Sequence, residues 1–554
     1  MEIFSNGKMR RLATASATVA VLATTLPAHG ETPSGGTQLP VNVPTPPPLV
    51  WAPCEVDPAH DCAVLTVPLN YANLAEGFID LPVARRRASG PGQLLGPLVL
   101  NFGGPAFPSG SALAGAGDEN FTPEMLELYD LVAVDARGTT NNITCFDSSQ
   151  LKEYWETNHF TRTSAELNHA LDLERAANQR CLQDDPSLVR HMSTAEDIRD
   201  LESLRLALGA NQFSFFGISY GTFFGNRYAT LYPGHIRAMV LDAVVDHGST
   251  DPQITSDLLK AHEGGWTAFK QWCADTANEC RLRGQNLDTV FDQVLAKARS
   301  PGIPAPLDFL QPDRPVNDWE LNFVLQAMMV PGNRFAWMEV ILYEASQNND
   351  ASLAGLIYDD ATGNQGDGTY VAGSGGTLRA IHCLDSRWSQ LLPNADAARA
   401  FTVAFKAISP HFGEAGFVQG DQWCFGYPVA PIEAAPVNTQ VAAGIPPVLV
   451  IGGTLDKNTP FKWAQNVAAR IPNSRLIVRN GPGHGSLSKS RCVQQIVADY
   501  LAHGTVPVNG TQCPTDPDLY PPVPAPDLTQ AQGNGRSHVN LVHGKAKTLL
   551  DPQE

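Results

Sequence analysis

Basic residues are scarce in this 554-residue chain. Lys and Arg number 38 against 56 Asp and Glu, which gives a formal net charge of −18 at pH 7. A partner rich in phosphates, such as a nucleic acid or an anionic membrane surface, is bound mainly through an excess of positive charge. The chain has no such excess and no long run of Lys and Arg, so we expect it to bind no nucleic acid.

Long apolar runs are also missing beyond the N-terminus, so we expect no stable insertion into a membrane. The N-terminus itself is typical of an export signal. A basic stretch from Lys8 to Arg11 precedes an apolar run over residues 12–26, and residues 28–30 (Ala-His-Gly) offer a cleavage site. A membrane anchor is the alternative, but the run is shorter than the ~20 apolar residues that a span needs. We therefore predict a secreted or periplasmic, extracytoplasmic protein.

Metal-binding cysteine motifs are absent, because the ten cysteines include no C-x-x-C pair. Nothing in the sequence calls for a metal or an organic cofactor, and we expect none. In an exported chain an even number of cysteines favours disulfides. The sequence alone leaves the connectivity open; taken in chain order, the local pairs would be Cys54 with Cys62, Cys145 with Cys181, Cys273 with Cys280, Cys383 with Cys424, and Cys492 with Cys513.

Short apolar runs alternate with segments of helical pattern over much of the chain. Continuous apolar runs bounded by Gly or Asp suit parallel strands that are covered on both faces. Between some of these runs lie helical patterns at 195–208 and 221–231. The alternation predicts a mostly parallel, doubly wound α/β sheet. The strand candidates are residues 97–102, 131–134, 213–216, 238–241, 447–451 and 475–478.

Residues 248–445 break this alternation, because strand signals are few there and helical patterns recur (255–274, 286–299, 317–345 and 395–408). We interpret this stretch as a mainly helical cap inserted over the strand ends. Both ends of the chain are rich in proline or polar residues. The predicted divisions are a signal peptide (1–30), a flexible lead-in (31–49), the first part of the α/β core (50–247), the cap (248–445), the second part of the core (446–513) and a poorly ordered tail (514–554).

The strongest functional signal is the pentapeptide Gly217-Ile218-Ser219-Tyr220-Gly221. A G-x-S-x-G string alone is common, but here a strand candidate enters it and a helical pattern leaves it. In such a sharp turn the glycines let neighbouring chain approach, and the serine hydroxyl is exposed at the carboxyl end of the sheet. An ordinary glycine-rich turn is the alternative. The context favours Ser219 as a nucleophile.

A serine nucleophile needs a base and an acid that orients the base, and the α/β-hydrolase fold places them in the order Ser, Asp or Glu, His. Asp456 follows the strand candidate at 447–451, and His484 lies in a glycine-rich loop after the candidate at 475–478. We predict that His484 takes the serine proton and that Asp456 orients His484. The three residues then form a catalytic triad on an α/β-hydrolase fold.

Two loops after early strands carry further candidates. Gly104 lies in a Gly-Gly-Pro loop, and we predict that this loop forms the oxyanion hole with the backbone N–H of Tyr220. A tight structural turn is the alternative for this loop. Asp135 and Arg137 follow another strand, and we interpret them as structural, either a buried ion pair or a brace for the loop.

Together, these motifs resemble the tripeptidyl aminopeptidase and proline iminopeptidase branch of the α/β hydrolases, with a TAP-like C-terminal segment. The match runs from about Trp51 to Cys513 and takes in the Ala380–Asp385 segment and the cysteine spacing, so it favours the sequential disulfides. The motifs that carry it are G-G-P at 103–105, D-x-R-G at 135–138, G-I-S-Y-G-T at 217–222, G-T-L-D-x-x-T-P at 453–460 and G-H-G at 483–485.

The resemblance implies a serine aminopeptidase that releases short peptides or residues from peptide N-termini through an acyl-enzyme. In such enzymes acidic residues of the cap would bind the free amino terminus, and Asp359, Asp360 and Asp385 are candidates. A carboxylic ester hydrolase is the alternative, because acyl-enzyme chemistry does not fix the leaving group. A catalytically inactive binding module is less favoured, since every triad member is present. The expected substrate is a peptide or a small ester, and the oligomeric state stays open.

Overall fold

The computed structural model describes residues 41–525 except 93, 116, 142, 309, 312–313, 330–333, 372–374, 438 and 442–443. The predicted signal peptide, most of the lead-in and residues 526–554 of the predicted tail lie outside the described residues. The structure places the last residues of the lead-in and the first of the tail in contact with the fold. The Tyr232 hydroxyl donates to the Val41 carbonyl (2.6 Å), and the Trp337 indole N–H donates to the Pro524 carbonyl (2.8 Å). Residues 514–525 thus make hydrogen bonds to the rest of the chain, although the sequence predicts a poorly ordered tail there.

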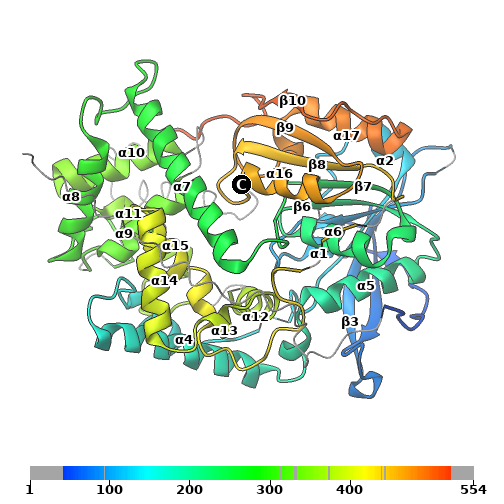
Figure 1. Cartoon of the computed structure of the whole chain (residues 1–554), viewed down its shortest axis with the longest axis horizontal. Helices are drawn as coiled ribbons and strands as arrows, with labels where there is room; N and C mark the ends of the chain where they lie inside the picture. The colour runs from blue at the N-terminus through cyan, green and yellow to red at the C-terminus, as the bar shows by residue number, and fades with distance from the viewer. Residues whose placement is uncertain are drawn as a thin grey trace, which may run out of the picture. The chain divides into compact units, whose positions relative to one another are not determined.

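The described residues form a ten-stranded sheet with the order β1-β2-β3-β5-β4-β6-β7-β8-β9-β10. Figure 1 shows this sheet on the right, beside a group of helices on the left. Neighbouring strands from β5 to β10 pair in parallel, whereas β1, β2, β3 and β5 pair antiparallel. The mostly parallel sheet and the α/β-hydrolase class are confirmed. The strands are β1 (Ala52–Pro53), β2 (Asp61–Pro68), β3 (Phe78–Arg86), β4 (Pro97–Asn101), β5 (Asp130–Val134), β6 (Phe213–Ile218), β7 (Ile236–Asp242), β8 (Val448–Leu455), β9 (Arg475–Pro482) and β10 (Thr511–Pro514).

Helices cover both faces of this sheet, which explains the continuous apolar runs of its strands. In β4, Val99 packs in the apolar cluster shared with α5, α6 and α16, whereas Leu98 and Leu100 pack in the cluster shared with α1, α2 and α17. Figure 1 shows α2 and α17 on one side of the sheet and α5 on the other. These helices are α1 (Ser109–Gly115), α2 (Pro123–Leu128), α5 (Thr194–Ala207), α6 (Gly221–Leu231), α16 (Phe461–Arg470) and α17 (Arg491–His503). Short 3-10 turns are η1 (Leu74–Glu76), η2 (Val189–His191), η3 (Pro233–His235) and η6 (Leu487–Lys489).

A second group of helices, here called the helical unit, lies mostly between β7 and β8 and has its own apolar core. Two earlier helices, α3 (Ser148–Glu156) and α4 (Ser164–Asp184), also belong to the unit: α4 buries its apolar face in this core, and Trp155 of α3 packs against it. The predicted insertion at 248–445 did not include them. The other members are α7 (Asp251–Ala274), α8 (Leu287–Arg299), α9 (Asp318–Ala327), α10 (Phe335–Tyr343), the π-helical turn η4 (Glu344–Asn348), α11 (Ser352–Thr362), α12 (Gly375–Asp385), α13 (Trp388–Leu391), α14 (Ala395–Ile408), α15 (Gly413–Val418) and the 3-10 turn η5 (Asp421–Cys424).

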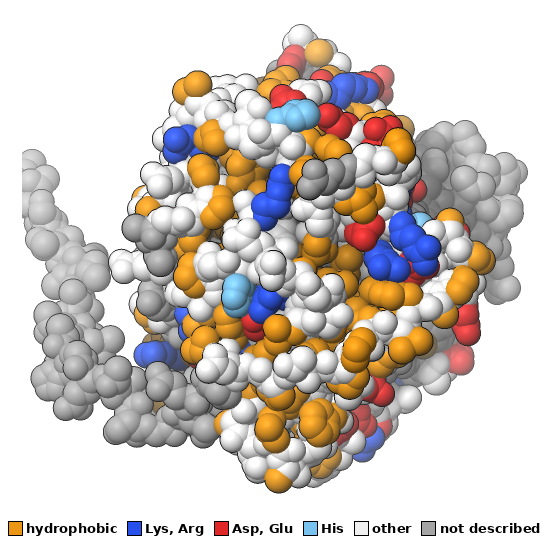
Figure 2. Space-filling model, turned by 90° about the vertical axis from the view of Figure 1, so that its right-hand side faces the viewer, with side chains coloured by type: hydrophobic (Ala, Val, Ile, Leu, Met, Phe, Trp, Pro, Cys, Tyr) orange, Lys and Arg blue, Asp and Glu red, His pale blue; other side chains and the backbone are white. Residues whose placement is uncertain are grey.

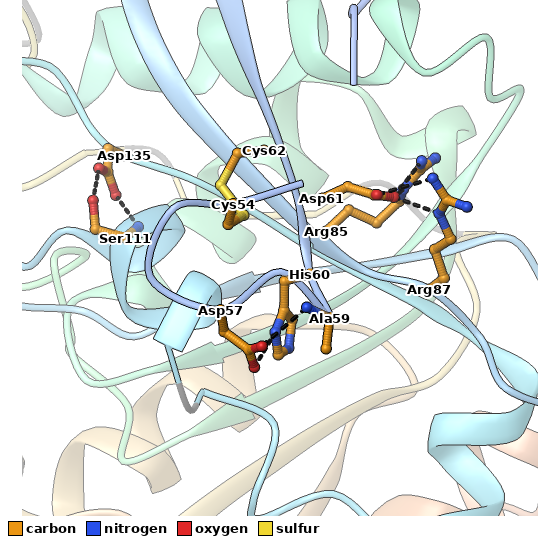
Figure 3. Close-up of a disulfide and its surroundings, with 10 residues drawn as sticks. All are labelled: Cys54, Asp57, Ala59, His60, Asp61, Cys62, Arg85, Arg87, Ser111 and Asp135. Carbon is orange, nitrogen blue, oxygen red and sulfur yellow. Dashed lines mark hydrogen bonds and ion pairs between the residues drawn. A yellow bond between two sulfur atoms is a disulfide. The ribbon is translucent and has the colours of Figure 1, made fainter. Parts of the chain in front are cut away.

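The ten cysteines form five disulfides in chain order, as the resemblance favoured. Cys54–Cys62 closes the β1–β2 hairpin at one edge of the sheet (Figure 3). Cys383–Cys424 joins α12 to η5 across a sequence separation of 41 residues. Closing a loop of this size stabilises a fold by a few kcal/mol in the chain-entropy model, on the order of 3–4.

Of the two interpretations of Asp135 and Arg137, a mutual ion pair is not formed, because each has another partner. Asp135 accepts hydrogen bonds from the Gly110 N–H (2.6 Å) and the Ser111 hydroxyl (2.6 Å) in α1 (Figure 3). A carboxylate there satisfies N–H groups that the first turn of a helix leaves free. The buried Arg137 guanidinium instead binds Asp200 of α5 (2.6 Å). Asp135 and Arg137 are therefore two separate braces for the loop after β5.

The surface of the described residues carries mixed charges. Figure 2 shows one face on which Lys and Arg side chains are scattered in small groups between apolar and acidic ones. Among residues 41–525, apart from the gaps given above, no helix is long and apolar enough for a membrane span.

Candidate active site

Ser219 lies in the sharp turn between β6 and α6. Its φ of 56° is in the left-handed region, which is uncommon for a residue other than glycine and marks local strain. Two hydrogen bonds hold this conformation: the Ser219 N–H donates to the Asp242 carbonyl (3.0 Å), and the Ser219 carbonyl accepts from the Thr222 N–H (2.9 Å). The flanking glycine is required, because a Cβ on Gly221 would lie 2.4 Å from the Asn101 carbonyl oxygen.

The side chains of His484 and Asp456 lie within hydrogen-bonding distance of each other. Nδ1 of His484 lies 2.9 Å from Oδ2 and 3.1 Å from Oδ1 of Asp456. Asp456 is buried, and Thr459 donates to it through its N–H (3.0 Å) and its hydroxyl (2.8 Å). Burial alone would raise the pKa of Asp456, but His484 and the Thr459 donors hold it below its ordinary value. Asp456 thus stays a carboxylate and fixes the imidazole with its other nitrogen, Nε2, free to act.

Ser219 and His484 both face one cavity of about 790 Å³ between the strand ends and the helical unit. A volume of this order is typical of binding sites for small organic ligands and short peptides. None of its lining residues is Lys or Arg, whereas four are Asp or Glu. The lining residues are Phe102, Gly104, Phe107, Ala112, Gly117, Glu119, Asn120, Ile218, Ser219, Tyr220, Val245, His247, Asp251, Ile254, Thr255, His382, Asp385, Ser386, Trp388, Asp421, Asn458, Thr459, Trp463, His484 and Ser488.

The predicted oxyanion donors, Gly104 and Tyr220, both line this cavity. The loop before Gly104 runs directly against the serine turn, since a Cβ on Gly103 would lie 3.0 Å from the Cβ of Ser219. The Gly103 N–H donates a hydrogen bond to Oδ1 of the Asn101 side chain (2.9 Å). The N–H groups of Gly104 and Tyr220 make no hydrogen bond to any of the described residues. They are therefore available to a negatively charged oxygen next to Ser219.

The three acidic candidates for binding an amino terminus are not together. Asp385 lines the cavity, but Asp359 and Asp360 do not. Asp359 is buried inside the helical unit, where its carboxylate pairs with Arg314 (2.9 Å). Its helix, α11, packs against α9. Asp359 and Asp360 therefore belong to the helical unit, but they do not line the cavity that Ser219 lines.

Asp385 instead belongs to a group of four cavity residues, here called the acidic cluster: Asp251, His382, Asp385 and Asp421. His382 Nε2 lies 3.5 Å from Oδ1 of Asp421. Burial raises the pKa of Asp385 to about 7 and that of Asp251 to about 6. Burial opposes a charge on His382, yet Asp421 and its acidic neighbours raise the pKa of His382 above its ordinary value.

Two carboxyl groups of the acidic cluster are held by neighbouring donors. The hydroxyls of Thr194 and Tyr220 donate to Oδ2 of Asp385, both at 2.7 Å. The Arg387 N–H donates to Asp251 (2.8 Å). Sequence reasoning missed Asp251, His382 and Asp421; the Cys383–Cys424 disulfide, which joins α12 to η5, was the signal that could have brought two of them together.

Comparisons with known proteins give relatives over most of the chain. The sequence model of the family described as TAP-like protein matches residues 409–513. The chain is 27% identical to the tripeptidyl aminopeptidase of Streptomyces lividans over 84% of this chain and 86% of that protein. It is also 27% identical to the serine protease Hip1 of Mycobacterium tuberculosis over 84% and 91%, and 25% identical to carboxylesterase B of the same species over 82% and 86%. The predicted resemblance is confirmed.

A solved structure of a proline iminopeptidase from Mycobacterium smegmatis also matches, with 14% identity, 79% of this chain and 97% of that chain covered, and a TM-score of 0.31.

Proposed function

We propose that this chain, a serine hydrolase related to tripeptidyl aminopeptidases, cleaves short peptides from the free N-termini of peptide substrates. The observation that carries the proposal is the acidic cluster, which shares one cavity with Ser219 and His484. A substrate ammonium group that leaves water needs an opposite charge in the protein. This cavity offers carboxylates and no Lys or Arg among its lining residues.

The geometry supports acyl transfer in two steps. The Ser219 hydroxyl attacks the substrate carbonyl carbon while Nε2 of His484 takes the serine proton. The carbonyl oxygen becomes an oxyanion, which the N–H groups of Gly104 and Tyr220 stabilise. His484 then gives the proton to the leaving amine as the C–N bond breaks. Water, activated by the same imidazole, hydrolyses the acyl-enzyme and releases the short N-terminal peptide.

Asp456 supports both steps because its carboxylate accepts a hydrogen bond from Nδ1 of His484 (2.9 Å). The pKa of Asp456 is lowered, so the group stays ionised at neutral pH and stabilises the imidazolium that forms during each proton transfer. Replacing the carboxylate by an amide in such a site removes this stabilisation and favours the wrong tautomer of the histidine.

The acidic cluster gives the cavity its polarity. Asp251, with a pKa of about 6, is mostly ionised at neutral pH. The Cys383–Cys424 disulfide holds the two segments that carry His382, Asp385 and Asp421 next to each other. Since the cluster belongs to the helical unit and the serine to the sheet, the separation between them sets how many residues of a peptide fit before the scissile bond.

Ester hydrolysis is the second candidate, because one relative of similar identity is a carboxylesterase. A neutral ester would use Ser219, His484 and the same oxyanion donors but would have no use for the carboxylates. The two candidates therefore differ in what they require of the acidic cluster. We also propose an extracytoplasmic location, which five disulfides among the described residues support.

Two experiments test these assignments. A fluorophosphonate probe should label the protein covalently, and Ser219→Ala should remove the labelling; persistent labelling would identify another nucleophile. Free and N-acetylated tripeptide anilides, together with short p-nitrophenyl esters, then separate the two activities. We expect acetylation to lower kcat/KM by about 100-fold or more, because it removes the ammonium that pairs with Asp251. Equal turnover of free and acetylated peptides would reject the aminopeptidase and favour the esterase.

Asp251→Asn provides the matched variant for this comparison. It should lower kcat/KM for the free tripeptide about tenfold or more and leave the ester unchanged within about twofold. Asp396→Asn, an exposed acidic residue of α14, is the control and should change neither substrate.

A further inference from the structure

Lys457 directly follows the catalytic acid candidate Asp456 in the sequence and reaches from the sheet to the helical unit. Its Nζ donates to the backbone carbonyls of Gln326 (3.0 Å) and Ala327 (3.2 Å). These two residues end helix α9. The carbonyls in the last turn of a helix carry the negative end of the helix dipole, so a lysine amino group is well matched to them. The Gln326 carbonyl also accepts from the Met329 N–H (3.2 Å).

Close apolar packing does not fill this junction. A second cavity, of about 270 Å³, separates α7 from the loop that begins at the end of β8, and Asp456 and Lys457 are among its lining residues. At another edge of the same cavity, Nζ of Lys462 lies 3.1 Å from Oδ1 of Asp257 in α7. One lysine of the loop, Lys457, and one at the start of α16, Lys462, therefore connect this region of the sheet to the helical unit.

The position of Lys457 is tied to that of the Asp456 carboxylate. Oδ1 of Asp456 accepts from the Asn458 N–H (2.9 Å) and the Thr459 N–H (3.0 Å), so the carboxylate closes a tight turn over the next three residues. Lys457 lies inside this turn. A shift of Lys457 would move the turn and, with it, the carboxylate that orients His484.

We propose that Lys457 is a positioning residue for hydrolysis, which fastens the turn of the catalytic acid to the end of α9. This inference rests on the proposed roles of Asp456 and His484, and it applies to any substrate of the triad. The alignment of the triad then depends on how the helical unit is seated on the sheet. Productive geometry in such sites tolerates displacements of only about 0.5 Å, so loss of one fastening contact is enough to lower the rate.

The test compares Lys457→Met with Lys462→Met. Both changes keep most of the unbranched side chain and remove one terminal amino group that contacts the helical unit, but only Lys457 lies in the Asp456 turn. We expect Lys457→Met to lower kcat for a tripeptide anilide and for a p-nitrophenyl ester about tenfold each, with KM within about twofold. The rate of fluorophosphonate labelling should fall by a similar factor. Lys462→Met should leave all of these rates within about twofold.

Two further variants separate positioning from folding. Lys457→Arg keeps N–H donors at the end of a long side chain and should recover most of the rate, whereas Lys457→Gln is too short to place a donor at the position of Nζ and should not. Burial and the nearby Arg334 lower the pKa of Lys457 to about 7, so the comparison is based on the donors and not on the charge. Thermal melting and near-UV circular dichroism give the folded fraction, to which each rate is normalised. Equal effects of Lys457→Met and Lys462→Met, or a loss fully explained by the folded fraction, would overturn the proposal; if the Met variant does not fold, the Gln and Arg pair decides by the same criterion.

The ester arm keeps this result separate from the proposed aminopeptidase activity. If free and acetylated peptides react equally, the aminopeptidase assignment fails, while the ratio of wild-type to Lys457→Met ester rates still measures the positioning effect. If Ser219→Ala retains activity, the triad itself fails, and that outcome is visible before any lysine variant is made.

Discussion

Replacing Asp385 by Asn should change how the stability of the protein depends on pH. Asp385 is buried, its Oδ2 accepts hydroxyl hydrogen bonds from Thr194 and Tyr220, and burial raises its pKa to about 7. The unfolded chain has the ordinary value near 3.8. Between these two values the folded protein holds a proton on Asp385 that the unfolded chain releases.

The sign and size of the effect follow from this difference. Because the pKa of the folded protein is the higher one, the contribution of Asp385 to the free energy of unfolding is full below about pH 4 and is lost as the pH rises towards 7. About three pH units at roughly 1.4 kcal/mol each give a loss of roughly 4 kcal/mol. The amide of the variant does not titrate, so the variant should lack this part of the slope. In acid the variant should be less stable by about 1–3 kcal/mol, because the NH₂ group of the amide cannot accept the hydrogen bonds that a carboxyl oxygen accepts.

Urea unfolding measured from about pH 4 to about pH 8 tests this expectation, because the difference between wild type and Asp385→Asn contains the titration of Asp385 and of the groups that its charge affects, such as His382. Groups that Asp385 does not affect titrate in both proteins and cancel. The wild type is the more stable protein at about pH 4, and this difference in unfolding free energy should fall as the pH rises. At about 1.4 kcal/mol per pH unit it should reach zero between about pH 5 and pH 6, so that the variant is the more stable protein at neutral pH. A gap that stays constant over the whole range would refute the argument, and Asp396→Asn supplies the exposed control.

Three other changes probe the remaining parts of the fold. Gly103→Ala should lower fluorophosphonate labelling by about 100-fold or more, because the φ of Gly103 is +91° and the new Cβ would lie 2.6 Å from the Ile218 carbonyl oxygen next to Ser219. Gly96→Ala is the control for backbone strain alone, since Gly96 has a φ of +92° and nothing lies within 4 Å of its new Cβ. Removing Cys383 and Cys424 together should raise KM for free peptides more than for esters, because the disulfide joins two segments of the acidic cluster. Arg137→Met should lower the free energy of unfolding by about 3–5 kcal/mol, measured in urea, and leave kcat per folded molecule unchanged.

The central strands and the triad candidates could be predicted because their signals are local. Each apolar run is continuous where a parallel strand has helices on both faces, and the loops after β6, β8 and β9 carry Ser219, Asp456 and His484 directly. Glycine spacing on either side of Ser219 then marks a turn that only small residues allow. No residue far away in the chain is needed for these inferences.

The antiparallel edge could not be predicted in the same way. Strands β2 and β3 alternate between buried and exposed residues, and β3 contains a proline and ends in two arginines. An edge hairpin with one solvated face has no continuous apolar run, so the criterion that found the parallel strands does not apply to it. Helices α3 and α4 lie within the predicted first part of the core (50–247) for a related reason: their sequence shows an apolar face but not which layer covers it.

The acidic cluster lies beyond such local reasoning because its members come from three separate segments, at Asp251, at 382–385 and at Asp421. These segments come together through the packing of the helical unit and through one disulfide, Cys383–Cys424. A chain can therefore share the local motifs of the triad with relatives that act on different substrates, and this one is similar to an aminopeptidase and to a carboxylesterase at nearly equal identity. The substrate has to be argued from the residues that only the folded chain brings together, and here those residues are carboxylates in a cavity whose lining has no Lys or Arg.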